Sequence, residues 1–130
     1  MTAFVYRHSG ILLVVWILFI FLLCAMPGQY FPSAGWMELL SFDKWVHAAL
    51  FFVLNFLFFL FAHKRHQNRV YLYLYTLLGI IYGVGLEMMQ ASLFSNRSFD
   101  YMDMVANALG GLIALFMHRF LHKLFSRWLA

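Results

Sequence analysis

Nine polar residues lie at or just inside the ends of apolar segments, and many of them are spaced by three or four positions. Asp43 and His47, for example, are four residues apart, and this spacing places two side chains on one face of an α-helix. Carboxylates, an imidazole and cationic groups on adjoining helix faces can bind an anion, a polar head group or a divalent metal. We therefore predict a ligand-binding set that comprises Asp43, Lys44, His47, Glu87, Gln90, Arg97, Asp100, Asp103 and Asn107.

Three functions are open to these residues. In the first, Arg97 and Lys44 hold the anion of a lipid or lipidated head group, because Arg offers phosphate a bidentate fork. In the second, a divalent metal activates water in an intramembrane hydrolase or transferase, although no helix carries the paired-histidine motif of zinc proteases. The candidate metal ligands are His47, Glu87, Asp100 and Asp103, of which His47 and Glu87 are also the candidate catalytic residues. In the third, the cluster only locks together the helices of a structural or accessory subunit.

Most of these residues also have a simpler structural explanation. Asp100 or Asp103 can cap a helix and face its dipole, and Gln90 and Asn107 can form interhelical hydrogen bonds. His47, taken alone, is more often a hydrogen-bonded core residue than a ligand. These explanations do not account for so many polar groups at one level, so we rank binding first, scaffolding second and catalysis third. We predict no cofactor, with a divalent metal as the alternative, and assign no enzyme activity.

The segments that must position these residues are strongly apolar. The chain has 130 residues, 65% hydrophobic and 11% charged, whereas soluble domains carry roughly 45–50% apolar and 25% charged residues. Four apolar blocks are each close to the roughly 20 residues that a helix needs to cross a membrane, and their continuous apolar runs do not alternate as barrel strands do. They cover about 10–26, 45–62, 70–89 and 103–121. We predict an all-α polytopic membrane protein with a single domain, residues 1–130, built as a four-transmembrane-helix antiparallel bundle.

The charges predict how this bundle lies in the membrane. Seven of the nine Lys and Arg residues flank one end of the four blocks, while the five acidic residues lie at or near the other end. Because basic loops stay in the cytoplasm, the basic 63–69 connection and both termini are expected there. The 27–44 and 90–102 connections then face outward. The net charge of +4 is explained by this topology, and the bases form no folded surface for nucleic acid.

Two features predict how the helices pack inside the bundle. Gly79 and Gly83 lead at intervals of four to Glu87, and a second stripe of small residues contains Gly110 and Gly111. Small residues let membrane helices approach closely, so both stripes should face other helices. Glu87 then points into the bundle about 26 Å from the inner start of its helix. Its available partners are Lys44, His47 and Arg97.

Other residues carry no predicted site. Asn55 should bond Thr76 or a backbone carbonyl, and the Phe-rich stripe within 51–61 should face lipid. Four histidines flank the inner ends of the helices, where we predict no constellation: His63, His66, His118 and His122.

The order and spacing of the polar residues resemble a known family over nearly the whole chain. The matching elements are Pro27-Gly28, Asp43-Lys44-x-x-His47, Glu87-x-x-Gln90 and Arg97-x-x-Asp100-x-x-Asp103-x-x-x-Asn107-x-x-Gly110. This set resembles the VanZ-like family of small bacterial membrane proteins. One departure is Phe94-Ser95-Asn96, where the family usually has a Pro-Gly-like turn before the arginine.

The resemblance implies a location and a class of partner. It implies a multi-pass protein of the bacterial inner membrane, linked to lipidated glycopeptide antibiotics such as teicoplanin or to cell-envelope lipids. The expected partners are membrane lipids, a lipid-linked or lipidated small molecule, and an oligomer or larger membrane complex, without nucleic acid.

Overall fold

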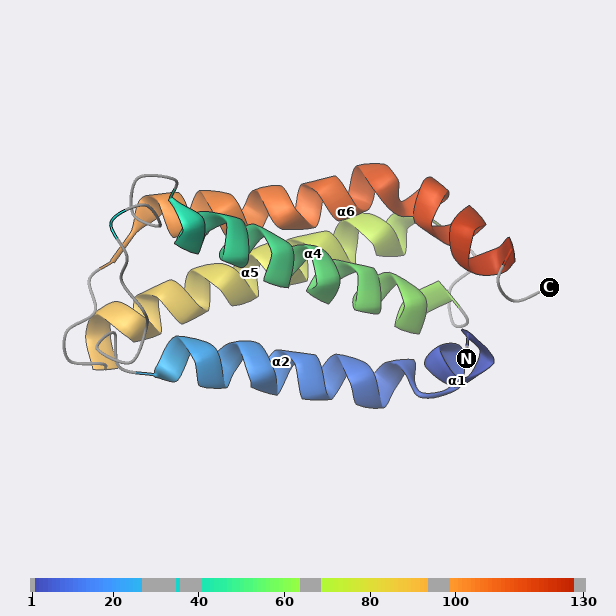
Figure 1. The fold of residues 1–130 in the computed structure, drawn as a ribbon, viewed down its shortest axis with the longest axis horizontal. Helices are drawn as coiled ribbons and strands as arrows, with labels where there is room; N and C mark the ends of the chain where they lie inside the picture. Colours follow the sequence, from blue (N-terminus) through green and yellow to red (C-terminus); the bar gives the residue numbers. More distant parts are fainter. Residues whose placement is uncertain (1, 27–34, 36–40, 64–68, 94–98, 128–130) are drawn as a thin grey trace.

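The computed structural model describes residues 2–26, 35, 41–63, 69–93 and 99–127. Its long regular elements within these ranges are all helices, which confirms the predicted helical class (Figure 1). They are α1 (Thr2–Arg7), α2 (Ser9–Ala25), α4 (Phe42–His63), α5 (Val70–Leu93) and α6 (Tyr101–Arg127). The short helix α1 was not predicted.

Three helices extend beyond the predicted apolar blocks, and the additions carry polar residues. Helix α4 begins at Phe42, so Asp43 and Lys44 lie in its first turn. Helix α5 continues past Gln90, and α6 begins two residues before Asp103. The predicted blocks are too short because they include only the apolar residues. Hydrophilic residues near a membrane surface can continue the same helix. Asp43, Lys44, Gln90 and Asp103 therefore lie on helices, and Asp100 lies directly before the first residue of α6.

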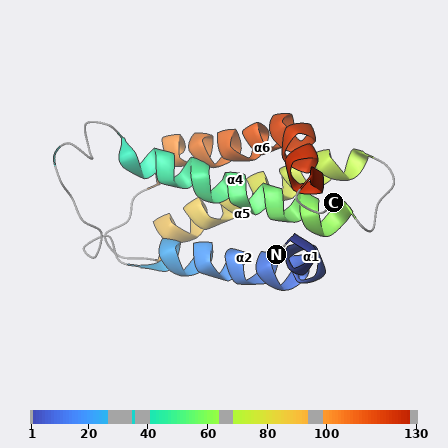
Figure 2. The same cartoon turned by 45° about the vertical axis from the view of Figure 1, so that its right-hand side comes forward.

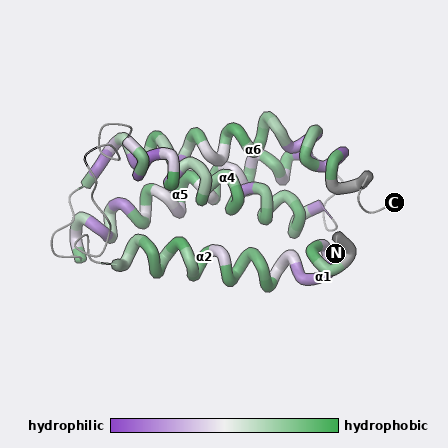
Figure 3. The backbone as a smooth tube through the Cα atoms, in the orientation of Figure 1, coloured by the Kyte–Doolittle hydropathy of each residue, from purple (hydrophilic) through white to green (hydrophobic). Residues whose placement is uncertain are grey.

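Three helices are long and apolar enough to cross a membrane: α4, α5 and the Tyr101–Leu124 part of α6. Helix α2 is also apolar but has only 17 residues. Figure 3 shows hydrophilic segments mainly toward the helix ends, with largely hydrophobic middles. Large apolar side chains remain exposed along the outer faces, for example Ile11 on α2, Tyr73 on α5 and Phe116 on α6. Extensive exposed apolar surface of this kind is typical of a membrane or protein contact.

Helix α4 lies between α2 and α6 and also contacts α5 (Figures 1 and 2). Helices α4 and α6 run in the same direction, because His47 pairs with Asn107 near their starts and His63 pairs with His122 near their ends. Helices α2 and α5 run the opposite way (Figure 1). We call the end with Lys44 and Asp103 the acidic end, and the end with His63 and His122 the histidine end.

The central position of α4 corrects the prediction that its Phe-rich stripe faces lipid. Phe51 and Phe59 are buried, and Phe51 packs in a core cluster with Leu54 and Ile20. The reason is that neighbours cover α4 on several sides. Since both the bundle core and lipid are apolar, the apolar character of a phenylalanine does not distinguish them.

Close packing around α4 depends on glycine, as the stripes of small residues predict. A Cβ atom on Gly110 would overlap the backbone carbonyl oxygen of Ala48, so α4 and α6 touch backbone to backbone. Cβ atoms on Gly79 and Gly111 would lie 2.7 and 2.8 Å from the Nδ2 atom of Asn55. The Asn55 side chain therefore fills the space between glycines of α5 and α6. Its Nδ2 donates to the carbonyl of Phe51 at 2.9 Å, which confirms the predicted backbone bond.

Candidate binding site at the acidic end

Lys44 is the centre of the polar residues at the acidic end. Its Nζ lies 3.2 Å from Asp43 Oδ2, 2.9 Å from Asp100 Oδ2 and 3.0 Å from Asp103 Oδ1. An ammonium has three N–H donors, and three carboxylates accept them here. Lys44 thus links the first turn of α4 to the start of α6. It has no further donor for a phosphate, so its predicted role as a holder of an anion finds no support in this geometry.

Asp100 has a second structural role at the start of α6. Its Oδ1 accepts a hydrogen bond from the backbone N–H of Met102 at 2.8 Å, so Asp100 caps the helix. The hydrogen bond from Lys44 is the main cause that lowers the pKa of Asp100, and the Met102 N–H lowers it further. The expectation that one of the two aspartates is a cap is confirmed for Asp100.

His47 is oriented by a neighbour on α6. Its Nδ1 lies 3.0 Å from Asn107 Oδ1. Because an amide oxygen can only accept, Nδ1 carries the hydrogen and donates it. The second ring nitrogen, Nε2, lies 3.7 Å from Asp103 Oδ2. In the neutral tautomer that donates through Nδ1, Nε2 carries the lone pair that can bind a metal.

Glu87 reaches the same place from α5. It is only 1% exposed, and neither carboxylate oxygen has a hydrogen-bond partner among the described residues. One ligand atom each from His47, Glu87 and Asp103 lies within 4.8 Å of the other two. Three helices therefore contribute one group each to a small polar centre. Of the predicted partners of Glu87, His47 lies beside it. Lys44 is bonded to three aspartates instead, and Arg97 lies outside the described residues.

Among the described residues, the acidic end has more acidic than basic side chains. The ammonium of Lys44 contacts the carboxylates of Asp43, Asp100 and Asp103, and the carboxylate of Glu87 lies beside His47 and Asp103. With all of them ionised and His47 neutral, the formal charge of these described residues is −3. A cationic group or a metal ion would offset this charge, whereas an anion would add to it.

The predicted set is only partly brought together. Gln90 is buried, but its Nε2 donates to the backbone carbonyl of Cys24 at 3.0 Å, so this amide joins α5 to α2. Asn107 takes part through His47. Arg97 lies outside the described residues. The residues that the structure brings together are Asp43, Lys44, His47, Glu87, Asp100, Asp103 and Asn107.

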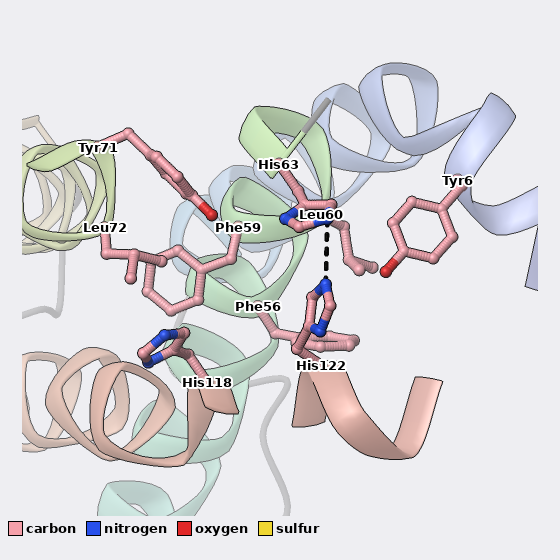
Figure 4. Close-up of a pocket in the computed structure, with 9 residues that line it drawn as sticks. All are labelled: Tyr6, Phe56, Phe59, Leu60, His63, Tyr71, Leu72, His118 and His122. Atoms are coloured by element: carbon pink, nitrogen blue, oxygen red, sulfur yellow. Dashed lines mark hydrogen bonds between the residues drawn. The ribbon is translucent and has the colours of Figure 1, made fainter. Parts of the chain in front are cut away.

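The prediction that the inner histidines form no constellation is wrong at the histidine end. His122 Nε2 lies 3.0 Å from His63 Nε2, beside a cavity of about 30 Å³ (Figure 4). Such a volume holds about one or two water molecules. The cavity is lined by Tyr6, Phe56, Phe59, Leu60, His63, Tyr71, Leu72, His118 and His122. The sequence could have indicated this pair. The second and fourth predicted helices run in the same direction, and each has histidines near its end.

The arrangement is that of an all-helical protein with three apolar helices of membrane-spanning length. The chain is 31% identical over 107 residues to an uncharacterized protein of Schizosaccharomyces pombe. The match covers 82% of this chain and 65% of the relative, so the chain spans less than two thirds of that protein. No family model matches the chain. No solved structure matches it either.

Proposed function

We propose that the acidic end binds the head group of a lipid or lipidated molecule. The observation that carries this proposal is the unbalanced carboxylate charge where polar helix ends meet apolar outer faces. An amphiphile fits these two surfaces. Its polar part can reach the carboxylates while its acyl chains lie along the exposed apolar side chains.

The contacts favour a head group with a primary amine. Asp43 and Asp100 have the most accessible carboxylates of the cluster, with side chains 58% and 41% exposed. An ammonium can donate to both, as Lys44 already does. The anionic part of the same head group is assigned to Arg97, because the three donors of Lys44 are already bonded.

We propose the following membrane arrangement for this function. Helix α2 crosses the membrane with the other three, since 17 residues is at the short end of the usual range. The antiparallel four-helix bundle then has both termini in the cytoplasm, where the basic 63–69 connection also lies, and the acidic end faces outward. The VanZ-like order of the motifs supports a bacterial inner membrane and a lipid or lipidated antibiotic as the ligand.

The test compares two head groups that share a phosphate. The purified protein, in detergent, is titrated with short-chain phosphatidylethanolamine and with phosphatidylcholine. The primary ammonium of ethanolamine can donate hydrogen bonds to carboxylates, but the trimethylammonium of choline cannot. We expect at least a tenfold preference for ethanolamine, lost in a D43N/D100N variant, and equal weakening of both lipids in R97Q.

A matched control is R119Q, which removes an arginine from the other end of α6. It should bind both lipids as the unchanged protein does. Equal affinity of the unchanged protein for the two lipids would contradict the amine contact. Unaltered binding by R97Q and by D43N/D100N together would contradict the proposed site.

A structural or accessory role is the second candidate, and specific hydrogen bonds favour it. Gln90 bonds α5 to α2, and Lys44 and Asn107 bond α6 to α4. Under this role the cluster only stabilises the bundle. Head-group affinity would then change only in variants whose melting temperature also falls.

A further inference from the structure

We propose that His47, Glu87 and Asp103 bind one divalent transition-metal ion. The site shares Asp103 with the Lys44 network, but the inference does not depend on head-group binding.

The first argument comes from Glu87. A carboxylate that is 1% exposed has lost its water, and neither of its oxygens is bonded within the described part of the chain. Buried polar groups are nearly always hydrogen-bonded, and buried charges are paired or coordinate metals. Glu87 lies beside two other groups that can be ligands, His47 and Asp103. Its burial there is explained by a cation bound among the three.

The second argument comes from the state of His47. Histidines that bind metals usually donate their other ring hydrogen to an oxygen, which fixes the tautomer and the ring orientation. His47 does so through Nδ1 to Asn107 Oδ1 at 3.0 Å. The remaining nitrogen, Nε2, is directed toward Asp103. Asn107 is therefore a positioning residue for the proposed ligand.

The third argument comes from how Asp103 divides its two oxygens. Oδ1 accepts from Lys44 at 3.0 Å, while Oδ2 lies 3.7 Å from His47 Nε2. Bonds of about 2.0–2.2 Å to a tetrahedral ion would place ligand atoms about 3.4 Å apart. The three ligand atoms, now within 4.8 Å of each other, need only a short movement toward that distance. The open fourth position suits a water molecule or a ligand.

A second group of acids lies next to the proposed metal site, but it already has a cation. Asp43, Asp100 and Asp103 also present ligand atoms within 4.8 Å of each other. The ammonium of Lys44 bonds to all three, so an internal cation already satisfies that group. Among the described residues, Glu87 has no ion pair with a lysine or an arginine, and its nitrogen neighbour in the group is the imidazole of His47. The imidazole ligand favours Zn²⁺ over Mg²⁺ or Ca²⁺, which prefer sites made of oxygen ligands alone.

The test measures metal binding by the full chain, purified without an affinity tag in lipid-free detergent and stripped with a chelator. ZnCl₂ is titrated by calorimetry, and CoCl₂ by visible absorption, since cobalt reports the ligand set. We expect one ion per chain and a cobalt spectrum typical of nitrogen and oxygen ligands. E87Q and H47A should each weaken binding at least tenfold, and N107A about tenfold with an altered cobalt spectrum.

The matched control is H63Q/H122Q, which removes the other close pair of histidines. This variant should still bind one zinc ion with unchanged affinity. Loss of zinc in H63Q/H122Q with retention in H47A would overturn the assignment, as would binding well below one ion per chain.

A second measurement separates a lost ligand from a misfolded variant. Zinc should raise the melting temperature of the unchanged protein and leave that of E87Q unchanged, while E87Q without metal should melt no lower than the metal-free unchanged protein. Equal stabilisation of both by zinc would refute the site. D43N/D100N should lose the lipid preference and still bind zinc, so failure of the two proposals can be told apart.

Discussion

Lys44 Nζ and Asp103 Oδ1 lie 3.0 Å apart although 59 positions separate them in the chain. The contact joins the first turns of two parallel helices, α4 and α6. Both side chains are mostly buried, with exposures of 24% and 13%. The pair therefore fixes the relative height of these helices at the acidic end.

Replacing Lys44 with Met should destabilise the protein by about 1–3 kcal/mol, because Asp103 would remain buried without its donor. For a chain of this size this corresponds to a fall in melting temperature of at least about 3 °C. Thermal unfolding in detergent measures it. The matched change D43N removes only an exposed partner and should cost less than about 0.5 kcal/mol. Equal effects of the two changes would contradict this difference in burial.

Gly110→Ala should be strongly destabilising, since the added Cβ overlaps the carbonyl of Ala48 and a backbone atom cannot turn away. Overpacking of this kind costs about 1–3 kcal/mol or more. The control is Gly85→Ala on α5, where nothing lies within 4 Å of the added atom. Helix propensity alone should make that change neutral or stabilising by up to about 1 kcal/mol. Melting temperatures in the same detergent compare the two, and similar values would show that the close approach is absent.

Asp100 should make stability depend on pH in the acidic range. Its folded-state pKa is lowered, so the contribution of its ionised form is fully present above the unfolded pKa of about 3.9. The contribution is lost as the pH falls through the lower folded pKa. The difference in melting temperature between the unchanged protein and D100N should thus be constant above about pH 5 and shrink below about pH 4. A difference that grows on acidification would have the wrong sign.

The hydrogen bond between His63 and His122 should be lost in acid, because it needs one ring nitrogen without a hydrogen. In the neutral pair one Nε2 donates and the other accepts, whereas two imidazolium rings are both donors and repel each other. Tyr6 of α1, Tyr71 of α5 and His118 of α6 also line this cavity, and the lining includes no carboxylate. When the pH is lowered from about 7.5 to 5.5, the unchanged protein should lose more thermal stability than H63Q/H122Q. Parallel curves for the two proteins would contradict the prediction.

Much of the helical fold could be predicted from the chain because long apolar runs admit few other structures. The meeting of His47, Glu87 and Asp103 also followed from residue spacing and helix direction. The hydrogen-bond partners within that cluster could not be predicted from the spacing. Three aspartates near Lys44 are equivalent by spacing, and only the helix rotations decide that all three share its ammonium.

The sequence also did not predict how each apolar helix is rotated about its own axis. Gln90 is one turn from Glu87, yet it bonds to α2. Phe51 is buried although its apolar surface would suit lipid equally well. In a membrane the hydrophobic effect does not separate an inner from an outer face, so polarity patterns lose the information they carry in soluble helices.

Helix α2 receives two hydrogen bonds on its main chain from α5. Tyr82 donates to the carbonyl oxygen of Ile17 at 2.8 Å, and Gln90 donates to that of Cys24. Since α2 supplies only carbonyl oxygens to these bonds, almost any residue type at positions 17 and 24 can preserve them, provided that its size fits. The side-chain chemistry at positions 17 and 24 thus takes no part in these two bonds, whereas removal of the Tyr82 hydroxyl or the Gln90 amide would break one of them.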